Sequence, residues 1–553
     1  MGKEELLHLY RQLDKECALL SRYQLEEKET QEAFIPDKDN MKKIWERWKS
    51  LCRRVAELEE PDRVFSMVKH HFQDFLESLE YTFYDTEDHP ERYHLTIHWE
   101  IETVSRLNRH TDEERCEELT RSINQRCRVK EPFLKLMKEK YDTARREELA
   151  SDFLEESRTV EKCRIDERKL FPTFSEGQIK CLDEALGNLR DVMEEMANDL
   201  AEDKRNGPEI KEDDLTITVK MTEEEYRILL NKKFGVSLDE LLSWYQEEMN
   251  KTRRNVFDIA AGLDIPEQAP KTMQEVNDIL IKYEGPCSSA EEMLDRANDY
   301  LKRTRALAHE YVKLPDDEIC RCVEVPESCK ESYPWGGYEG GDFSIRPFIG
   351  QMFLNTYNYQ NVTDGWIKLN SIHEAYPGHH VQYVRAAVDE TPETVKIGAK
   401  LVPLLEGTCL RSEKAFQFIY GEDPFFPLFV AYRRHHASVR ICADLMLFYF
   451  GKTLEEVVEL YEKELGFDRG TARGQVLAQQ YTPGYFTCYY YGMKKICEWE
   501  KEYGFSKQDF TELLFSAGYI GISRFEELVK MTAEERERYF HEFSSLLAKE
   551  NKV

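Results

Sequence analysis

Long apolar runs are missing from the 553-residue sequence. Nothing approaches the roughly 18 consecutive apolar residues that a membrane-spanning helix needs. The opening segment, MGKEELLHLYRQLDKECALL, carries charges where the apolar stretch of a secretory signal would lie. The sequence therefore predicts a cytoplasmic protein that begins with an amphipathic helix and has no membrane partner.

Glycine, proline and basic residues are also in short supply. The 26 glycines and 19 prolines are too few for a collagen-like or low-complexity chain. Lysine and arginine number 77 against 107 aspartates and glutamates, which gives a net charge of −30. This excess of negative charge argues against binding to nucleic acid or to an anionic membrane. With 41% hydrophobic residues the chain can still bury a large core, so a folded protein is expected.

The 14 cysteines form only one tight group, which consists of Cys320, Cys322 and Cys329. Their spacing lacks the paired C-x-x-C and the nearby histidine of a structural zinc site. Free thiols in a reducing cytosol are the better interpretation, and a three-cysteine zinc site is the weaker alternative.

Helical periodicity dominates the chain up to about residue 315. Apolar residues recur at three-to-four spacing over 39–60, 175–200, 237–263 and 288–312, and the last two segments each open on a serine that can cap a helix. No fixed-period repeat that would indicate a solenoid is found. The exceptions are DLTITVKMT (214–222) and the segment 320–325, which we expect to be strands.

The texture changes from about residue 330, where glycine and aromatic residues become frequent. DFSIRPF (342–348) and GQMFLNTYN (350–358) show strand-like alternation and predict a small sheet. Helical texture returns at Ile367 and continues to the end. The expected fold is therefore mainly α with a small sheet, divided into residues 1–315 and 316–553.

Chemistry concentrates in the stretch SIHEAYPGHHVQ (371–382). A zinc peptidase helix normally carries H-E-x-x-H, because ligands four residues apart project from one face. Here, at about 100° and 1.5 Å per residue, His379 would lie about 120° off the face of His373 in a continuous helix. His380 would share that face, but about 10 Å along the axis. Neither arrangement lets two histidines hold one ion.

Pro377 supplies the break that a metal site would require. Its ring clashes with the carbonyl four residues back, at His373, and Gly378 tolerates an unusual backbone. A helix end with two exposed histidines is the alternative interpretation. The His-Glu pair just upstream favours the metal site.

HEAYPGHHVQ fits the pattern H-E-x-x-x-G-H-x-x-Q, and through it the sequence resembles the domain-of-unknown-function 885 family, which is similar to the zincin metallopeptidases. The segments FLNTYN, LLEGTCLRSE, ASVRICADLMLFYFGKTLEEVVELYEKELGF and YTPGYFTCYYYGMKKI extend the resemblance over roughly residues 300–500. It implies a two-lobed helical zincin-like fold of the neurolysin or carboxypeptidase Taq type. Residues 1–315 would wall a cleft, and residues 316–553 would form the catalytic lobe.

Helical zincins such as carboxypeptidase Taq, thimet oligopeptidase and angiotensin-converting enzyme offer a more distant likeness. It implies that His373 and His379 bind one zinc ion, with His380 as the alternative to His379, and that Glu374 is the general base. The third ligand would be Glu406, which lies 406 − 379 = 27 residues on. Glu413, seven residues further, would support the site without binding the metal. Another divalent transition metal is the alternative to zinc.

A tyrosine is implied as the donor to the oxyanion. GYFTCYYYG (484–492) resembles the carboxypeptidase Taq segment G-Y-F-P-T-Y-T-L-G, in which a tyrosine lines the active site. Tyr489 is the matching position, with Tyr491 and Tyr485 in reserve. Aromatic packing is the alternative role, and we expect it for at least one of the tyrosines.

Charged side chains further along suggest substrate contacts. Arg440 and Asp444 are four residues apart, so they form either an internal pair or a site in which Arg440 binds a substrate's C-terminal carboxylate. Arg346 is a weaker candidate for that role. His436 is expected to line the cleft or to pack in the interior.

The residues and the resemblance together imply a zinc-dependent hydrolase of peptide or peptide-like amide bonds, of the carboxypeptidase or oligopeptidase type. One alternative is hydrolysis of a small non-peptide amide or C–N bond at the same metal. The other is a non-catalytic helical binding protein that retains the fold.

Overall fold

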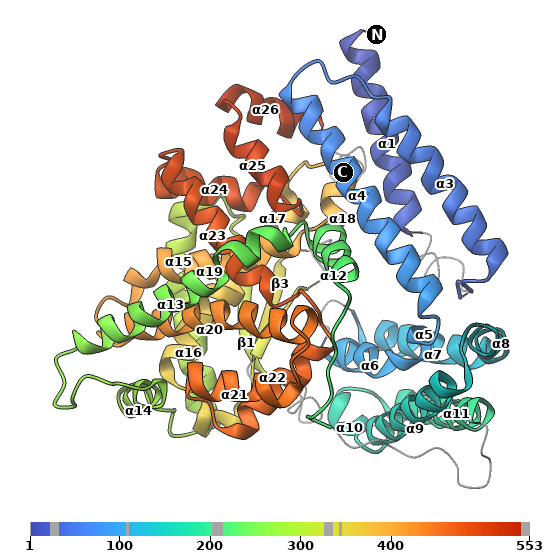
Figure 1. Cartoon of the computed structure of the whole chain (residues 1–553), viewed down its shortest axis with the longest axis horizontal. Helices are drawn as coiled ribbons and strands as arrows, with labels where there is room; N and C mark the ends of the chain where they lie inside the picture. Colours follow the sequence, from blue (N-terminus) through green and yellow to red (C-terminus); the bar gives the residue numbers. More distant parts are fainter. Residues whose placement is uncertain are drawn as a thin grey trace.

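Helices make up most of the protein, and a small sheet lies among them (Figure 1). The computed structural model describes residues 2–22, 33–106, 110–201, 214–325, 336–341 and 346–543. Over these residues the expectation of a mainly α fold with a small sheet is confirmed. No helix of the described part is both long and apolar enough to span a bilayer.

Helices fill the chain ahead of the sheet. They are α1 (Lys3–Arg22), α3 (Lys38–Ala56), α4 (Arg63–Asp88), α5 (Arg92–Leu95), α6 (Ile97–Arg106), α7 (Asp112–Arg128), α8 (Lys130–Lys140), α9 (Thr143–Ile165), α10 (Glu167–Leu170), α11 (Glu176–Leu200), α12 (Glu223–Leu229), the π-helical turn η1 (Leu230–Phe234), α13 (Leu238–Ala261), α14 (Met273–Tyr283) and α15 (Ala290–Tyr311). Ser237 and Ser289 cap α13 and α15 as expected, because each side chain accepts a hydrogen bond from a backbone N–H of the first turn.

Helices resume after the sheet and continue to the end of the described chain. They are η3 (Thr356–Asn361), α16 (Asp364–Asn370), the π-helical turn η4 (Ser371–Ala375), α17 (His379–Val388), α18 (Glu393–Ile397), α19 (Val402–Ala415), η5 (Gln417–Tyr420), α20 (Phe426–Asp444), η6 (Leu445–Tyr449), α21 (Leu454–Leu465), α22 (Arg469–Gln480), α23 (Thr487–Glu502), α24 (Lys507–Ser516), α25 (Ile522–Lys530) and α26 (Ala533–Glu542).

The sheet has the strand order β1-β3-β2. Strand β1 (Glu318–Glu324) pairs in parallel with β3 (Phe348–Leu354), in the register that sets Cys320 opposite Gly350. Strand β2 (Gly336–Glu339) pairs with β3 in antiparallel fashion. The π-helical turn η4 contacts both β2 and β3, so the sheet lies directly beside the stretch predicted to bind metal.

Two strand predictions agree with the structure and one is wrong. Segment 320–325 falls on β1, and the first half of 350–358 falls on β3 before the chain turns into η3. Residues 342–345 lie outside the described residues, and β2 had no sequence signal. DLTITVKMT is not a strand, because its carbonyls at Leu215 and Ile217 accept hydrogen bonds from the first turn of α21 instead of from a neighbouring strand.

Cys320 and Cys322 are buried free thiols on β1. Cys329 lies outside the described residues. Among the described residues, the cluster of histidines and a cysteine that could hold a metal includes neither Cys320 nor Cys322.

Two hydrophobic cores stabilise the described part. The smaller core consists of side chains from α6 to α11 and is closed by Phe353 of β3. The larger core combines α1, α3 and α4 with most elements from α12 onward, so residues on both sides of position 315 share it. That residues 1–315 wall a cleft and residues 316–553 form a separate lobe stays a prediction.

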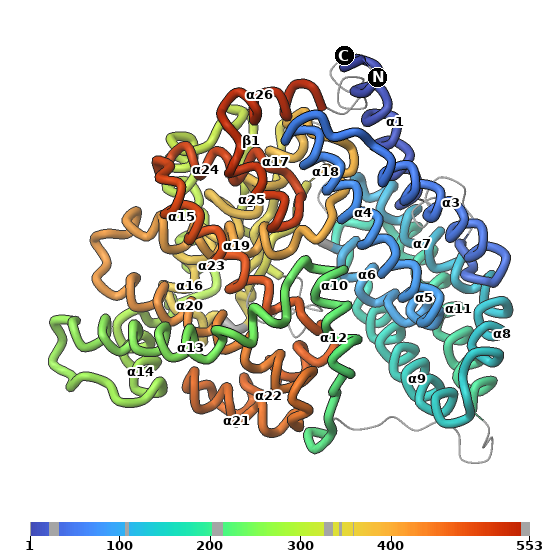
Figure 2. The backbone as a smooth tube through the Cα atoms, turned by 45° about the horizontal axis from the view of Figure 1, so that its top comes forward, coloured from blue at the N-terminus to red at the C-terminus, as the bar shows by residue number. Residues whose placement is uncertain are grey.

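Segments from the two ends of the described chain lie side by side (Figures 1 and 2). The ring of Tyr10 on α1 contacts Phe65 at 5.0 Å and Phe543 at 5.7 Å between centroids. Helices α25 and α26 pack against α4. The larger core therefore has the first and last described helices at its edge.

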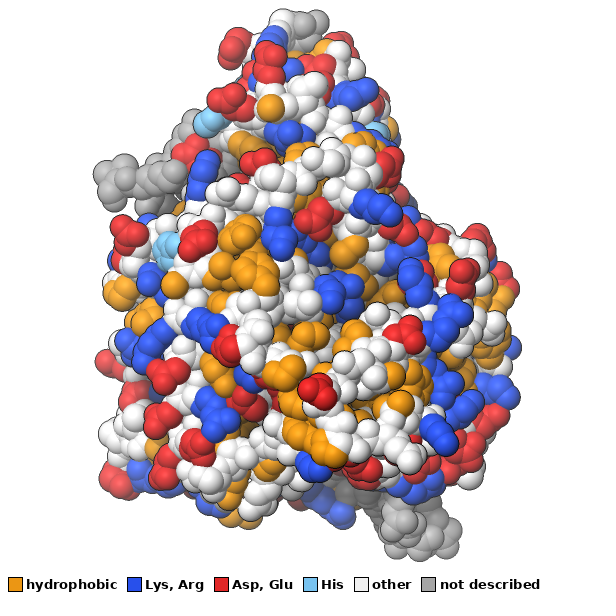
Figure 3. Space-filling model, turned by 90° about the vertical axis from the view of Figure 1, so that its left-hand side faces the viewer, with side chains coloured by type: hydrophobic (Ala, Val, Ile, Leu, Met, Phe, Trp, Pro, Cys, Tyr) orange, Lys and Arg blue, Asp and Glu red, His pale blue; other side chains and the backbone are white. Residues whose placement is uncertain are grey.

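The surface mixes charges of both signs despite the net charge of −30. The face drawn in Figure 3 carries acidic and basic side chains interspersed, with small hydrophobic patches between them. The acidic side chains on this face therefore do not form one continuous negative patch.

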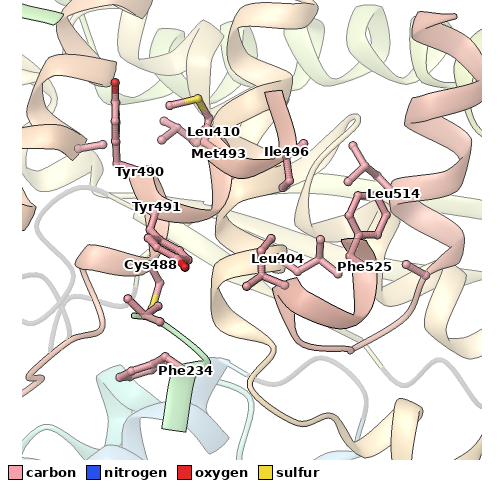
Figure 4. Close-up of a cluster of buried hydrophobic side chains, with 14 of the residues drawn as sticks. Phe234, Leu404, Leu410, Cys488, Tyr490, Tyr491, Met493, Ile496, Leu514 and Phe525 are labelled. Atoms are coloured by element: carbon pink, nitrogen blue, oxygen red, sulfur yellow. The ribbon is translucent and has the colours of Figure 1, made fainter. Parts of the chain in front are cut away.

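Helices α19 and α23 cross very closely. A Cβ added to Gly407 on α19 would lie 2.5 Å from the carbonyl carbon of Gly492 on α23, and a Cβ on Gly492 would lie 1.7 Å from the oxygen of Pro403. Only glycine permits this approach. Figure 4 shows the side chains packed around the crossing, which include Cys488, Tyr490, Tyr491, Met493 and Ile496 of α23 and Leu404 and Leu410 of α19.

Candidate metal centre

The backbone breaks where the sequence predicts it. The π-helical turn η4 ends at Ala375, Tyr376 is extended, and α17 begins at His379. A Cβ on Gly378 would lie 2.0 Å from the carbonyl oxygen of His373, so the chain folds back tightly over the turn that it has just left. As a result the rings of His373 and His379 lie 5.2 Å apart between centroids.

One carboxylate oxygen lies close to a nitrogen of each imidazole. Oε2 of Glu406 lies 3.4 Å from Nε2 of His373 and 3.4 Å from Nε2 of His379. Bonds of about 2.0–2.1 Å at tetrahedral angles would separate two ligand atoms by about 3.3–3.4 Å, so the spacing fits one zinc-sized ion. Oε2 of Glu406 is buried and has no hydrogen-bond partner in the described part of the chain. The His373, His379 and Glu406 set therefore fits a divalent metal.

The other nitrogen of each imidazole is held by an acceptor. Nδ1 of His373 lies 2.7 Å from Oε1 of Glu413, which is fully buried. Nδ1 of His379 lies 2.9 Å from Oε1 of Gln382, whose amide nitrogen donates to the carbonyl of Leu405. These contacts fix the tautomers and aim both Nε2 atoms at Glu406. The sequence reasoning gave Gln382 no role, although it is the glutamine of H-E-x-x-x-G-H-x-x-Q.

Cys409 also lies close to the two histidines, and its ligand atom falls within 4.8 Å of theirs. Its Sγ is 3.5 Å from Nδ1 of His379, which is the nitrogen that faces Gln382. Because the two imidazole nitrogens face away from one another, an ion on the Nε2 side of His379 meets Glu406 and not this thiol. Glu406 therefore fits the place of a third ligand better than Cys409 does.

His380 faces another group. Its Nε2 lies 2.7 Å from Oε2 of Glu318 and its Nδ1 lies 2.9 Å from the hydroxyl of Tyr338. Glu318 also accepts hydrogen bonds from Tyr376 and Arg305. His380 is completely buried in this network, so the alternative of a helix end with two exposed histidines is wrong.

Glu374 lies in η4 between the candidate ligand His373 and the break. It is half-buried, and none of the described residues forms a hydrogen bond or an ion pair with its carboxylate. Its carboxylate is close enough to contribute to raising the pKa of His373. Its position and lack of a partner leave it available to exchange a proton.

Two of the three candidate tyrosines come to the centre. The hydroxyl of Tyr485 donates to Oε1 of Glu406 at 3.0 Å and lies 3.2 Å from the hydroxyl of Tyr489. The ring of Tyr489 is nearly parallel to that of His373, with centroids 6.3 Å apart. Tyr491 points elsewhere, because its hydroxyl donates to Glu240 on α13.

A buried group of cations lies behind Tyr489. The guanidinium carbon of Arg440 lies 4.5 Å from the ring centroid of Phe486 and 5.5 Å from that of Tyr489, and the guanidinium carbon of Arg433 lies 5.7 Å from Tyr489. Nitrogens of Arg433, Arg440 and His436 are buried without partners among the described residues. Burial and the charge of Arg433 lower the pKa of Arg440 to about 10, and burial and both arginines hold the pKa of His436 well below its ordinary value.

Arg433 was missed from the sequence, although it stands in the run Arg433-Arg434-His435-His436. Its nearest carboxylate is Glu413, with Nε and Oε1 3.9 Å apart. The group therefore has more positive than negative charge, and it can receive an anion.

Asp444 does not pair with Arg440, so the internal-pair hypothesis is wrong. Its carboxylate accepts hydrogen bonds from the hydroxyl of Tyr226 at 2.6 Å and the backbone N–H of Gly484 at 2.9 Å. Arg440 instead donates to Gln475.

Arg346 is another candidate that lies apart from the metal centre. It pairs with Asp317 at 2.6 Å, with about half of its side chain exposed. Its guanidinium lies over the ring of Phe348, and none of the three ligand residues contacts it in the described chain.

Comparisons with known proteins give a family and a fold. The family model described as "Bacterial protein of unknown function (DUF885)" matches residues 113–529. A Colwellia psychrerythraea structure described as a "putative lipoprotein" is 15% identical, with a TM-score of 0.71, over 95% of this chain and 98% of its own. A Shewanella oneidensis structure, described as a "putative lipoprotein of unknown function", is 13% identical, with a TM-score of 0.68, over 96% and 100%. At these identities the likeness shows the fold alone. No curated protein matches the chain.

Proposed function

The chain belongs to the family of bacterial proteins of unknown function called DUF885, and we propose that it is a metal-dependent hydrolase of peptide or peptide-like amide bonds. In this proposal the fold is zincin-like and Zn²⁺ is the metal. The observation that carries the proposal is the convergence of His373, His379 and Glu406, in which the oxygen facing both imidazoles is buried and unpartnered.

The donor set suits catalysis better than a purely structural role. Two imidazoles and one carboxylate leave a fourth position of a tetrahedral metal open, whereas structural zinc sites are closed, with four protein ligands. When bound, the metal supplies an electrophile for a carbonyl and lowers the pKa of water. Glu413 and Gln382 hold the two histidines in the orientation that such a site requires.

The residues around the ligands have distinct roles in the proposed reaction. Glu374 accepts a proton from the attacking water and passes it to the departing nitrogen. Tyr485 donates to Glu406, and within the described part of the chain the hydroxyl of Tyr489 contacts that of Tyr485 alone. Tyr489 is therefore the phenol available to donate to the oxygen that becomes negative.

The cations behind Tyr489 suggest which part of the substrate binds there. Arg440 and Arg433 are buried, have unpartnered donors and lie against the aromatic rings that border the metal centre. An arginine fork matches the two oxygens of a carboxylate. This favours peptides or peptide-like amides with a free C-terminal carboxylate, hence a carboxypeptidase type of cleavage. A cytoplasmic location stays a prediction.

The test combines metal analysis with hydrolysis. Chelated and zinc-reloaded full-length protein is analysed by mass spectrometry, and a peptide library is digested by wild type, Glu374→Gln and the control Glu459→Gln, whose glutamate is exposed on α21. We expect one zinc per chain in all three, with hydrolysis by Glu374→Gln reduced by about 10²-fold or more.

The ligand assignment has its own readout. We expect His379→Ala to lose the metal and His380→Ala to keep it, because His380 faces Glu318. The proposal fails if wild type binds no metal at saturating zinc, or if Glu374→Gln hydrolyses the library as fast as wild type. Metal binding without hydrolysis of any peptide or amide would favour the binding-protein alternative.

A further inference from the structure

A pocket lies beside the metal centre and shares with it helix α19, which carries Glu406. It lies among α13, α19, α20 and α23 and has a volume of about 380 Å³. This is within the range of pockets that hold small organic molecules. Arg434 and Tyr490, which line it, directly follow Arg433 and Tyr489, which face the metal centre. The two sites are therefore neighbours that share α20 and α23.

Basic side chains dominate the charge of this pocket. Five of them line it, namely Lys251, Lys414, Arg434, Lys494 and Lys501. The lining carboxylates are Glu248 and Glu498, so the five positive charges exceed the negative ones by three. In a chain whose net charge is −30, such a local excess is opposite to the average.

Among the described residues, carboxylates neutralise two of the five cations. Lys251 pairs with Glu248 at 3.1 Å, and Lys494 pairs with Glu498. Over the described ranges, no carboxylate lies within ion-pair distance of Lys414, Arg434 or Lys501.

Nζ of Lys414 donates to Oε1 of Gln417 at 3.2 Å, whereas Arg434 is incompletely hydrogen-bonded. Nε of Arg434 is buried and has no partner among the residues that the structure describes. Desolvation and the charge of Arg434 lower the pKa of Lys414, so the two cations already repel one another. An anion placed between them would relieve this repulsion and supply the missing acceptor.

The remaining wall is partly polar, with Thr252 and Asn255, and partly apolar. Ala431, Met493, Cys497 and the ring of Tyr490 form part of the wall. Figure 4 shows Tyr490 and Met493 on α23, beside the packed core. The hydroxyl of Tyr490 is already bonded to Glu248, so its ring offers mainly apolar surface.

We propose that this pocket binds a small organic phosphate, with the phosphate between Lys414 and Arg434 and an apolar body against Tyr490 and Met493. A guanidinium fork and an ammonium group together match a doubly charged tetrahedral anion better than a single carboxylate. This binding is independent of the proposed hydrolysis.

Isothermal titration of the full-length protein tests the proposal with phenyl phosphate, inorganic phosphate, citrate and phenol. We expect saturable binding of phenyl phosphate at one site, weaker binding of inorganic phosphate because the apolar contacts are lost, and no measurable binding of phenol. Lys414→Gln and Arg434→Gln should each weaken phenyl phosphate binding by roughly tenfold. The control Lys463→Gln, at a side chain that is 75% exposed on α21, should not change it.

Two further readouts separate this site from the metal centre and from a structural role. Arg440→Gln should leave phenyl phosphate binding unchanged, because Arg440 lies behind Tyr489. Lys414→Gln should not lower the melting temperature, since it removes a repulsion.

Several results would overturn the proposal. These are absence of saturable phenyl phosphate binding to wild type, unchanged affinity in both Lys414→Gln and Arg434→Gln, or loss of binding in Arg440→Gln alone. Tighter binding of citrate than of phenyl phosphate would indicate that the ligand is a polycarboxylate and not an organic phosphate.

Discussion

The carboxylate of Asp444 accepts a hydrogen bond from the backbone N–H of Gly484 at 2.9 Å. Gly484 adopts a positive φ of 78°, and it starts the turn that delivers Tyr485 to Glu406. A residue at the end of α20 thus sets the position of a phenol at the metal centre. The same carboxylate binds Tyr226 and Gln479, so it also ties this turn to α12 and α22.

Replacement of Asp444 by asparagine should loosen that turn. An asparagine has one acceptor oxygen where the carboxylate has two, so a buried donor loses its partner, at a cost of about 2 kcal/mol in the free energy of unfolding. We expect lower stability by urea denaturation together with slower hydrolysis. Asp299→Asn is the control, because Asp299 is exposed and its one ion pair with a described residue is with Lys302. A stable variant with normal activity would show that the turn keeps its conformation without the Asp444 carboxylate.

The partners of the two histidines should control metal affinity. Replacing Gln382 by leucine removes the acceptor for Nδ1 of His379, and Glu413→Gln removes the charge beside His373. Each change should weaken zinc binding by about 10- to 100-fold in competition with a chelator. Glu459→Gln should bind zinc like wild type. Equal affinity in all variants would mean that the imidazoles need no orientation from these groups.

Gly378→Ala should damage the centre directly. The new methyl group would lie 2.0 Å from the carbonyl oxygen of His373, so the turn must move and the spacing of the ligands with it. We expect destabilisation by about 1–3 kcal/mol and loss of zinc. Gly474→Ala on α22 is the matched control, since nothing lies within 4 Å of its Cβ. It should be neutral or stabilising by up to about 1 kcal/mol. Similar behaviour of the two variants would contradict this account of the break.

Arg440 should matter only for substrates with a free carboxylate. For such peptides we expect Arg440→Gln to raise KM by about tenfold or more, because a charge-assisted hydrogen bond is lost. For the same peptides with an amidated C-terminus, KM should stay the same. A parallel loss for both sets of substrates would assign Arg440 to general support of the site.

Buried neutral histidines should make stability depend on pH. Burial lowers the pKa of His94 from 6.5 to about 3, so this side chain stays neutral in the folded protein while the unfolded chain takes up a proton below pH 6.5. The unfolded state therefore binds more protons in this window, and stability falls as the pH drops. For one such group the loss between pH 7.5 and pH 5 is about 2 kcal/mol.

His94→Gln should reduce that dependence. We compare the difference in unfolding free energy between pH 7.5 and pH 5, from urea denaturation, in wild type and variant. The difference should shrink by about 2 kcal/mol. The absolute stability of the variant can change for other reasons, so only the difference between the two pH values counts. An unchanged difference would mean that His94 is protonated when folded.

The sequence predicts the helices and the break well because both depend on local interactions. The serine caps of α13 and α15 and the proline at position 377 act on their own segments. The alternation in 214–222 gave a wrong strand prediction, because a strand also needs a neighbouring strand to pair with. The neighbour of this segment is the start of helix α21.

The site shows the same limit. Spacing alone could not choose between His379 and His380, since the choice depends on Glu318, which is more than 60 residues earlier in the sequence. The i, i+4 spacing of Arg440 and Asp444 suggested a pair, yet the nearby N–H of Gly484 and hydroxyl of Tyr226 occupy the carboxylate. Arg433 belongs to the site because it lies over the ring of Tyr489, and the sequence does not show that contact.

The contact between α1 and the segment after α26 has a consequence for synthesis on the ribosome. Phe543 packs on Tyr10 and Phe65, so the larger core cannot be completed before the last helices have been translated. The smaller core uses α6 to α11 almost entirely, and its helices emerge together. Domains of long chains tend to fold in the order of their synthesis. The smaller core can therefore fold while translation continues, with α1, α3 and α4 waiting for partners that leave the ribosome several hundred residues later.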